Sequence, residues 1–251
     1  MSKLIRFEYQ SMTCHGIIRG DKVWRISGGL FDEWYEQGDP FPLSDVRLLS
    51  PCLPSKIVAV GLNYRDHAME LSMEIPKEPI IFIKPGTSIC GPEDPIRYPP
   101  FSDQVDYEAE LGVVIQRHTK DIDPSEAPEY ILGYTCINDV TARDLQKRDG
   151  QWTRAKSFDS FCPIGPCIET ELDPSDCRVE CFLNGEVRQS SSTKNQVFPP
   201  FFLVSFISRI MTLLPGDIIA TGTPPGVGAM NIGDEVEVSV EGVGRLKNYV
   251  I

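Results

Sequence analysis

The sequence is poor in histidine and in basic residues, and both shortages exclude classes of protein. Its 251 residues include only three histidines, at positions 15, 67 and 118, so any histidine chemistry must use one of these. Aspartate and glutamate outnumber lysine and arginine by 36 to 24, which gives a formal net charge of −12. Nucleic acids and anionic membranes attract proteins with a basic face, so we expect neither as a partner.

Long hydrophobic runs and zinc-type cysteine pairs are also missing. The longest apolar stretch, residues 197–214, is interrupted by Pro199, Pro200 and Arg209 and does not predict a membrane span. The start, MSKLIRFEYQ, lacks the apolar core of a signal peptide, so we expect a cytoplasmic protein. The 8 cysteines include no C-x-x-C pair, which indicates reduced thiols that mostly fill the core. Whether any of these thiols is reactive is left open.

Short strand patterns dominate the first part of the chain. The segments IRFEYQ, HGIIRG and KVWRIS are separated by turn-like steps, and residues 27–43 resemble a loop that carries a short helix. Prolines at positions 51 and 54 then lead into an apolar strand, IVAVGLNY. These signals predict a small N-terminal β subdomain over residues 1–54 and a main domain over residues 55–251. The fold class that they indicate is mainly β with a few helices.

An acidic strand, VDYEAELGVV, is the most informative stretch of the sequence. Side chains alternate along a strand, so Asp106, Glu108 and Glu110 share one face while the apolar residues share the other. Three acids on one face repel each other and are costly to bury unless they are paired. Two explanations stay open at this point. The acids are solvated at the surface, or they bind a divalent cation, which prefers oxygen ligands.

The segment YRDHAMELSM predicts a helix with Asn63 as its N-cap. His67 and Glu70 are three residues apart and would be neighbours on one helical face. A carboxylate in this position can orient an imidazole and raise its basicity, as a general base requires. Taken in isolation, the same spacing favours an exposed helical ion pair.

Polar side chains also follow two other predicted strands. In GYTCINDVTARDLQKRD a strand leads into a helix that we expect to begin at Asn138 or Asp139. Asp139, Arg143 and Gln146 would then stack on one face, either as a surface ladder or as the wall of a carboxylate site with arginine as the fork. Lys84 ends the apolar strand PIIFIK, where it either reaches water or points into a polar cavity.

The last part of the chain predicts two hairpins around a helix. Asn184-Gly185 is a strong turn signal within DCRVECFLNGEVRQSSS, and the C-terminal residues alternate between apolar and polar. The segment FPPFFLVSFISRIMTLL predicts a helix that ends at Pro215-Gly216. A Gly- and Pro-rich loop at residues 222–228 is not a phosphate loop, because no Gly-Lys-Ser/Thr follows it.

Seven ordered motifs resemble those of the fumarylacetoacetate hydrolase family. They are GLNYRDHAMEL, FIKPGTS, VDYEAELGVVI, INDVTARDLQ, AKSFDSFCPIGP, LLPGDIIATGTPPGVG and VEGVGRLKN. The resemblance covers residues 55–251, and residues 1–54 resemble the small β subdomain of the shorter members. It implies a mixed β-roll core and a homodimer.

The resemblance also implies a site, residue by residue. The implied ligands of Mg²⁺ or Mn²⁺ are Glu108, Glu110 and Asp139, with Asp106 as a supporting residue. The implied catalytic residues are His67 and Glu70, which activate water from a closing lid, and Lys156, which stabilises negative charge. The implied substrate-binding residues are Arg143, Gln146, Thr223 and, as a weaker candidate, Lys84.

The activity implied by the resemblance is metal-dependent hydrolysis of a C–C bond in a 2-oxo or 2,4-dioxo acid, of the acylpyruvate or fumarylacetoacetate type. Oxaloacetate decarboxylation and isomerisation or tautomerisation of an oxo-diacid are alternatives at the same metal site. The His67–Glu70 pair favours hydrolysis, because only hydrolysis requires activated water. A binding module without catalysis is disfavoured, because the set of acids, lysine and His–Glu pair is complete. We expect specificity to come from the lid and from loops such as residues 86–92.

Overall fold

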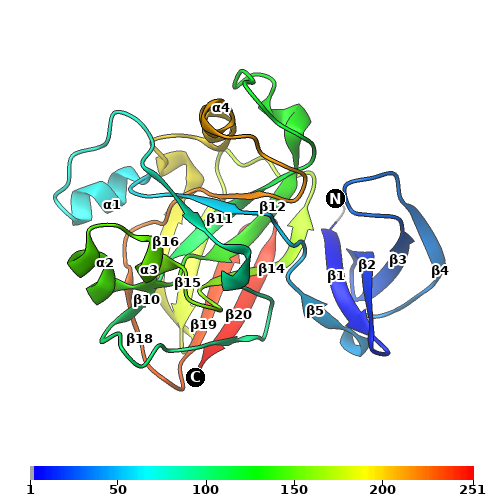
Figure 1. Ribbon diagram of the computed structural model, residues 1–251. Coiled ribbons are helices and arrows are strands. Elements are labelled where there is room, and N and C mark those ends of the chain that lie inside the picture. Colours follow the sequence, from blue (N-terminus) through cyan, green and yellow to red (C-terminus); the bar gives the residue numbers. More distant parts are fainter. Residues whose placement is uncertain (1–2) are drawn as a thin grey trace.

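The computed structural model describes residues 3–251, which form a mainly β structure of three sheets with four α-helices among them (Figure 1). The predicted fold class is confirmed. The helices are α1 (Arg65–Glu70), α2 (Arg143–Asp149), α3 (Thr153–Lys156) and α4 (Pro200–Ile210). Short 3₁₀ turns occur at Leu43–Asp45, Gly86–Ser88, Ala127–Tyr130 and Thr193–Asn195.

The largest sheet has twelve strands and runs through the whole molecule. Its main path is β4 (Tyr35–Pro42), β3 (Lys22–Ser27), β2 (Met12–Arg19), β1 (Lys3–Tyr9), β14 (Cys162–Glu169), β12 (Ile131–Asn138), β11 (Ala109–Ile115), β17 (Ile218–Ala220), β6 (Ile57–Val60) and β7 (Ile81–Lys84). Off this path, β5 (Arg47–Leu49) pairs with β1, and β8 (Ile89–Cys90) pairs with β14.

Two smaller sheets complete the fold. The three-stranded sheet has the order β13 (Thr141–Ala142), β10 (Val105–Tyr107) and β18 (Gly228–Met230). The five-stranded sheet has the order β16 (Glu186–Ser192), β15 (Arg178–Leu183), β19 (Glu235–Val240), β20 (Gly244–Val250) and β9 (Pro95–Ile96). The predicted hairpins are therefore present as β15–β16 and β19–β20. Asn184 and Gly185 form the first turn with φ values of 53° and 80°.

The N-terminal strands stand to one side of the molecule, yet they belong to the large sheet (Figure 1). The link is the antiparallel pairing of β1 with β14, in which Lys3 lies opposite Glu169. The predicted loop with a short helix over residues 27–43 is wrong, because most of its second half is strand β4. This strand pairs with β3 at the sheet edge, where prolines such as Pro40 are tolerated.

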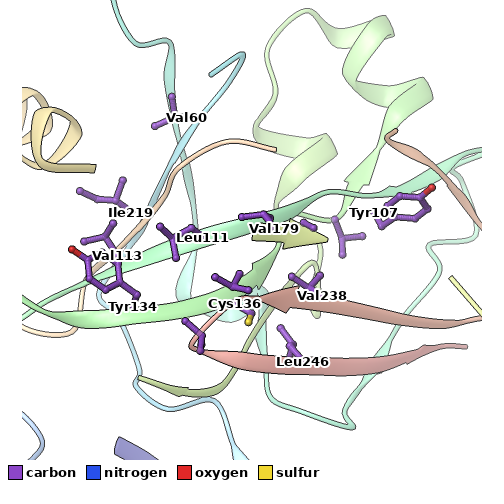
Figure 2. Close-up of a cluster of buried hydrophobic side chains, with 14 of the residues drawn as sticks. Val60, Tyr107, Leu111, Val113, Tyr134, Cys136, Val179, Ile219, Val238 and Leu246 are labelled. Carbon is purple, nitrogen blue, oxygen red and sulfur yellow. The ribbon is translucent and has the colours of Figure 1, made fainter. Parts of the chain in front are cut away.

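The main core lies between the large sheet and the five-stranded sheet. Figure 2 shows Leu111 and Val113 of β11 facing the same apolar space as Val179, Val238 and Leu246 of the smaller sheet. The opposite face of the large sheet is also buried, in a second cluster that includes Leu30, Ile57, Val114, Ile137 and Ile164. Both faces of β11 are thus removed from water, and none of its acids is a surface residue.

The acidic stretch is two strands. The chain leaves the three-stranded sheet after Tyr107 and joins the large sheet at Ala109, so Glu108 lies at the junction. The expectation of one continuous strand over residues 105–114 is therefore wrong. The alternation that places the acids on one side survives, because the interruption is a single residue.

Helix boundaries differ from the predictions at three places. Tyr64 precedes α1, and Asn63 is no N-cap because its side chain bonds Phe198 and Thr221 instead. The α2 helix begins at Arg143, so Asp139 precedes it and cannot stack on its face. The α4 helix ends at Ile210, before the predicted Pro215-Gly216 stop, because the chain turns extended at Met211.

The cysteines are in the state that the sequence predicted. All eight thiols are free and six of them are buried, as expected. Among residues 3–251 no helix is long and apolar enough to cross a membrane. His118 is exposed and His15 lies within β2, so neither contributes to a site.

Candidate active site

Three carboxylates meet in the interior. Glu108, Glu110 and Asp139 each direct an oxygen into a space in which these atoms all lie within 4.8 Å of one another. All three residues are buried, with relative exposures of 7%, 1% and 1%. Burial excludes the solvated-surface explanation for the two glutamates and shows a cluster of the kind that holds a divalent cation.

The backbone positions two of these acids together. The Glu108 amide donates to Asn138 Oδ1 at 2.9 Å, and the Asp139 amide donates to the Glu108 carbonyl at 2.8 Å. Pairing of β11 with β12, in which Ala109 lies opposite Asn138, sets this register. The glutamates and Asp139 therefore meet because β11 begins beside the residue at which β12 ends.

Buried cations surround the acids. Lys156 Nζ lies 2.9 Å from Glu108 Oε2 and 2.7 Å from Asp139 Oδ2. Lys84 pairs with the other oxygen of Asp139. Arg143 binds Glu108 and also Asp106, with 2.7 Å between Arg143 Nε and Asp106 Oδ2. Asp106 thus holds Arg143 beside the cluster and is not part of it.

The acids differ in their electrostatic surroundings. Burial acts to raise the pKa of Glu108, but the Lys156 and Arg143 cations outweigh burial and lower it to about 2. The pKa of Glu110 is raised well above its ordinary value by burial and by repulsion from Asp139 and Glu108. Burial lowers the pKa of Lys156, yet Asp139 and Glu108 raise it overall, so the lysine stays charged.

The residues fit a divalent cation. The donor set consists of carboxylate oxygens, which suit hard cations such as Mg²⁺ and Mn²⁺. Glu110 forms no ion pair among residues 3–251, and its Oε2 accepts from the Gly222 amide at 2.8 Å. A bound cation would compensate the charge on this buried carboxylate that no side chain neutralises.

His67 and Glu70 form the predicted pair on α1. The distance from His67 Nδ1 to Glu70 Oε2 is 2.9 Å, and the His67 side chain is only 12% exposed. Glu70 also accepts from the Gly226 amide, at 3.1 Å to Oε1. The pair is therefore more than a solvated helical contact, because Glu70 links α1 to the Gly- and Pro-rich loop.

One cavity of about 320 Å³ is lined both by His67 and by Glu108 of the acidic cluster. The residues that line it come from α1 and the segment after it, from β6 and β7, from α2 and α3 and from the loop after β17. They are Val60, Gly61, Leu62, His67, Leu71, Met73, Phe82, Glu108, Arg143, Gln146, Lys147, Trp152, Lys156 and Thr223. Figure 1 shows α1, α2 and α3 on the same side of the molecule.

The structure brings most of the predicted site residues together. Arg143 donates to Gln146 Oε1 at 2.6 Å, and both side chains line the cavity. Lys84 is fully buried beside Asp139, and like Glu110, Asp139 and Glu70 it is absent from the residues that line the cavity. Residues 86–92 are also absent from the lining, although they were expected to contribute to specificity.

Gln189 is a site-supporting residue that the sequence did not reveal. It is 1% exposed, its Oε1 accepts from the Ala109 amide at 2.9 Å, and its Nε2 donates to Thr223 Oγ1 at 2.8 Å. Thr223 Oγ1 in turn donates to the Ala109 carbonyl at 2.9 Å. The single hydroxyl hydrogen of Thr223 is thus committed to the backbone between the two glutamates. A glutamine in a polar hairpin strand carries no local signal of this role.

Sequence comparison places the chain in a family. The profile described as "Fumarylacetoacetate (FAA) hydrolase C-terminal" matches residues 56–251, and one described as "Rv2993c-like, N-terminal" matches residues 2–51. The protein belongs to the fumarylacetoacetate hydrolase family, a family of enzymes, as the seven motifs indicated.

Named relatives carry out several reactions. The mitochondrial oxaloacetate tautomerase Fahd2a of Rattus norvegicus is 44% identical over 222 residues, which cover 84% of this chain and 71% of the relative. The crystal structure of 2-hydroxyhepta-2,4-diene-1,7-dioate isomerase from Mycobacterium marinum has a TM-score of 0.94 at 43% identity, covering 100% and 98% of the two chains.

A further similar structure contains a metal ion. Maleylpyruvate hydrolase from Sphingobium sp. SYK-6, in complex with manganese(II) and pyruvate, has a TM-score of 0.83 at 27% identity and covers 99% of this chain and 98% of the other. Together with the buried acidic cluster, this neighbour supports a divalent metal site in the present chain.

Proposed function

We propose that the protein is a divalent-metal-dependent enzyme of 2-oxo acids that hydrolyses a C–C bond in a 2,4-dioxo acid. The observation that carries this proposal is the shared cavity. His67, which is paired with Glu70, lines the same cavity as Glu108, and the Glu108 carboxylate belongs to the acidic cluster with Glu110 and Asp139. A base and a site for an oxygen-rich anion in one enclosed volume are the two requirements of such a reaction.

The acidic cluster would hold Mg²⁺ or Mn²⁺ through Glu108, Glu110 and Asp139. When bound, the cation would polarise the oxygens of a 2-oxo acid and favour negative charge beside them. The chain contributes further donors to the same oxygens. Three of the five Arg143 N–H groups are used by Asp106, Glu108 and Gln146, which leaves two for a substrate carboxylate. Lys156 likewise uses two of its three donors on acids.

The base would be His67. If Nδ1–H donates to Glu70, the lone pair of Nε2 is free to take a proton. In hydrolysis the proton comes from water, the resulting hydroxide attacks the carbonyl carbon at position 4, and the bond between carbons 3 and 4 breaks. The proton held by His67 then passes to carbon 3 of the departing pyruvate unit. Lys156, charged and buried, would stabilise the negative charge that develops on the departing pyruvate unit.

Tautomerisation of an oxo-diacid is a second candidate. The observation that favours it is the similarity to an oxaloacetate tautomerase at 44% identity and to a dioate isomerase at 43% identity. In this reaction His67 would take its proton from carbon 3 of the substrate and return it to the oxygen of the enol. The same cavity serves both reactions, and they differ in whether water reaches the base.

An NMR time course tests the proposal and separates the two reactions. Chelator-treated protein is given acetylpyruvate or oxaloacetate, with and without added Mg²⁺. Acetate and pyruvate formed from acetylpyruvate only with Mg²⁺, and lost in His67→Ala, are the result that hydrolysis requires. Accelerated keto–enol exchange of oxaloacetate without cleavage of acetylpyruvate would select the second candidate. No effect on either acid, with the metal bound, would contradict both.

The assembly and the location stay predictions. We propose a homodimer on the family resemblance, and sedimentation velocity of the purified protein measures it directly.

A further inference from the structure

Lys147 is the cation of the cavity that no acid neutralises. Arg143 is paired with Asp106 and Glu108, and Lys156 with Glu108 and Asp139. Lys147 lines the same cavity, yet it forms no ion pair anywhere in the described part of the chain. Its charge is therefore available to a ligand.

The α2 helix places Lys147 at a defined distance from the acidic cluster. It follows Arg143 by four residues, so the two side chains lie on one face, about 6 Å apart along the helix axis. Arg143 is largely covered, with 18% of its side chain exposed, whereas Lys147 is exposed. Lys147 thus stands at the solvent side of the cavity, one helical turn beyond the arginine that contacts Glu108.

The wall of the cavity also includes an apolar portion. Phe82 and Trp152 meet edge to face with 5.3 Å between ring centroids, and Leu71 and Met73 line the cavity as well. Gly61 leaves room for the indole, since a Cβ there would lie 3.1 Å from it. The cavity therefore combines the buried Glu108 carboxylate and its cations, an apolar surface for a carbon chain, and a free ammonium at the exposed rim.

We propose that Lys147 binds the distal carboxylate of a 2-oxo dicarboxylic acid whose 2-oxo acid end lies at the acidic cluster. The inference rests on the proposed function, because it assumes that the 2-oxo acid end occupies the cluster. It goes beyond that function in assigning the residue that recognises the distal end of the substrate. The substrate is a diacid, and one exposed lysine distinguishes it from a monocarboxylic acid of the same length.

The expected effect is modest because the lysine is exposed. Ion pairs at exposed positions contribute little, and the partly enclosed rim strengthens them. We expect the loss of Lys147 to weaken diacid binding about five- to tenfold. Because the pair is screened by salt, the preference should shrink between about 0.05 M and about 0.5 M NaCl.

The test compares two acids that differ at one end only. Calorimetric titration of Mn²⁺-loaded protein with 2-oxoglutarate and with 2-oxopentanoate measures the contribution of the distal carboxylate. Both acids have five carbons and the same 2-oxo acid end, so 2-oxopentanoate reports on the proposed function alone. The titrations are repeated on Lys147→Ala and on Arg148→Ala. Arg148 is the neighbouring exposed cation, paired with Asp149 and absent from the cavity lining.

The expected result has two parts. Native protein and Arg148→Ala bind 2-oxoglutarate more tightly than 2-oxopentanoate, and Lys147→Ala loses this preference while binding 2-oxopentanoate unchanged. Equal affinity of the native protein for the two acids would overturn the inference and leave the proposed function standing. So would a Lys147→Ala variant that keeps the preference or weakens both acids equally. Failure of both acids to bind the Mn²⁺-loaded native protein would overturn the inference and the proposed function together.

Discussion

Glu108 and Glu110 are two residues apart and experience opposite surroundings. Glu108 is held by Lys156 and Arg143, which lower its pKa to about 2. Glu110 has a single backbone donor, the Gly222 amide, and its pKa is raised. Without metal, ionised Glu108 stabilises the fold through its partners, while ionised Glu110 destabilises it. The two glutamates should therefore respond differently to the same substitution.

Replacement of each glutamate by glutamine tests this difference. Both variants should lose Mn²⁺ binding in calorimetric titration, by about a hundredfold or more, since each removes an anionic ligand. In chelator-treated protein, Glu108→Gln should lower the free energy of unfolding by about 3 kcal/mol, because it leaves buried cations unpaired. Glu110→Gln should leave it unchanged or higher at pH 7. Urea unfolding measures both, and equal losses of stability would contradict the electrostatic assignment.

The pH dependence of metal-free protein follows from the raised pKa of Glu110. A carboxyl group with a raised folded-state pKa favours folding most at low pH, and this contribution is lost as pH rises from the ordinary value of 4.5 through the folded-state pKa. Native protein should therefore lose stability relative to Glu110→Gln over that range. A difference in the free energy of unfolding between native protein and Glu110→Gln that stays constant with pH would contradict the raised pKa of Glu110.

The thiols give a second prediction at the residue scale. Burial raises the pKa of Cys52 and of Cys162 to about 12, so almost no thiolate is present near neutral pH. Cys14 is only partly buried in the N-terminal strands. Iodoacetamide at about pH 8 should modify Cys14 first and leave Cys52 and Cys162 intact until the protein unfolds. Peptide mass spectrometry measures the order, and early modification of Cys162 would show that the site opens.

At the scale of elements, the α1 helix is fixed by polar side chains that reach the C-terminal half of the chain. Arg65 donates to the Gln196 carbonyl at 2.6 Å, and Asp66 accepts from Ser191. Glu70 accepts from the Gly226 amide. These contacts cluster on a helix of six residues that is too short to be stable alone. Its position, and with it that of His67, depends on them.

Removal of the Glu70 carboxylate should release one of these contacts and the imidazole together. We expect Glu70→Ala to lower turnover about 10- to 100-fold and to speed amide hydrogen exchange in residues 222–228. Glu74→Ala, an exposed acid in the following segment, is the control. Slower turnover with unchanged exchange would mean that Glu70 orients His67 without holding the loop.

The elements show which features a sequence can predict. The hairpin at Asn184-Gly185 and the His67–Glu70 pair depend on neighbours in the chain, so local patterns were sufficient. The start of α2 was misplaced because the two residues before it, Thr141 and Ala142, pair with β10, a tertiary contact that overrides the local capping signal of Asp139. The residues 27–43 were misassigned for the same reason.

The acidic cluster and Gln189 show which features local sequence patterns do not predict. Its members were implied by family resemblance, since the meeting of Asp139 with the glutamates depends on the register between β11 and β12. Gln189 was missed because its partners, the Ala109 amide and Thr223, lie about 80 and 34 residues away. Local patterns contain no information about such pairings.

At the scale of the whole molecule, the N-terminal strands stand to one side of the other strands, and their pairing nevertheless makes them part of the large sheet. Leu4, Ile17 and Leu30 pack in one apolar cluster with Ile57 and Ile164 of the remaining chain. This cluster covers one face of β11 and β12, the strands beside which the acidic cluster lies. The predicted boundary near residue 54 therefore divides a shared core.

A truncated chain tests whether the rest of the molecule depends on the N-terminal strands. Residues 55–251 alone should expose the apolar cluster and should aggregate or bind a hydrophobic dye, and the intact protein should unfold in a single transition. Circular dichroism and light scattering measure both. A soluble truncated chain with the melting temperature of the full protein would establish two independent domains.

The residues that line the cavity are of two kinds, buried and exposed. Its lining acid, Glu108, is buried among cations, where almost any change disrupts ion pairs, whereas Leu71 and Met73 on its wall are 50% and 55% exposed. Substitutions at exposed positions usually alter stability by less than about 0.5 kcal/mol. A lineage can therefore change its substrate by surface mutation while the interior stays constant. Overall identity between two members then measures their common descent far better than the acid that each one consumes.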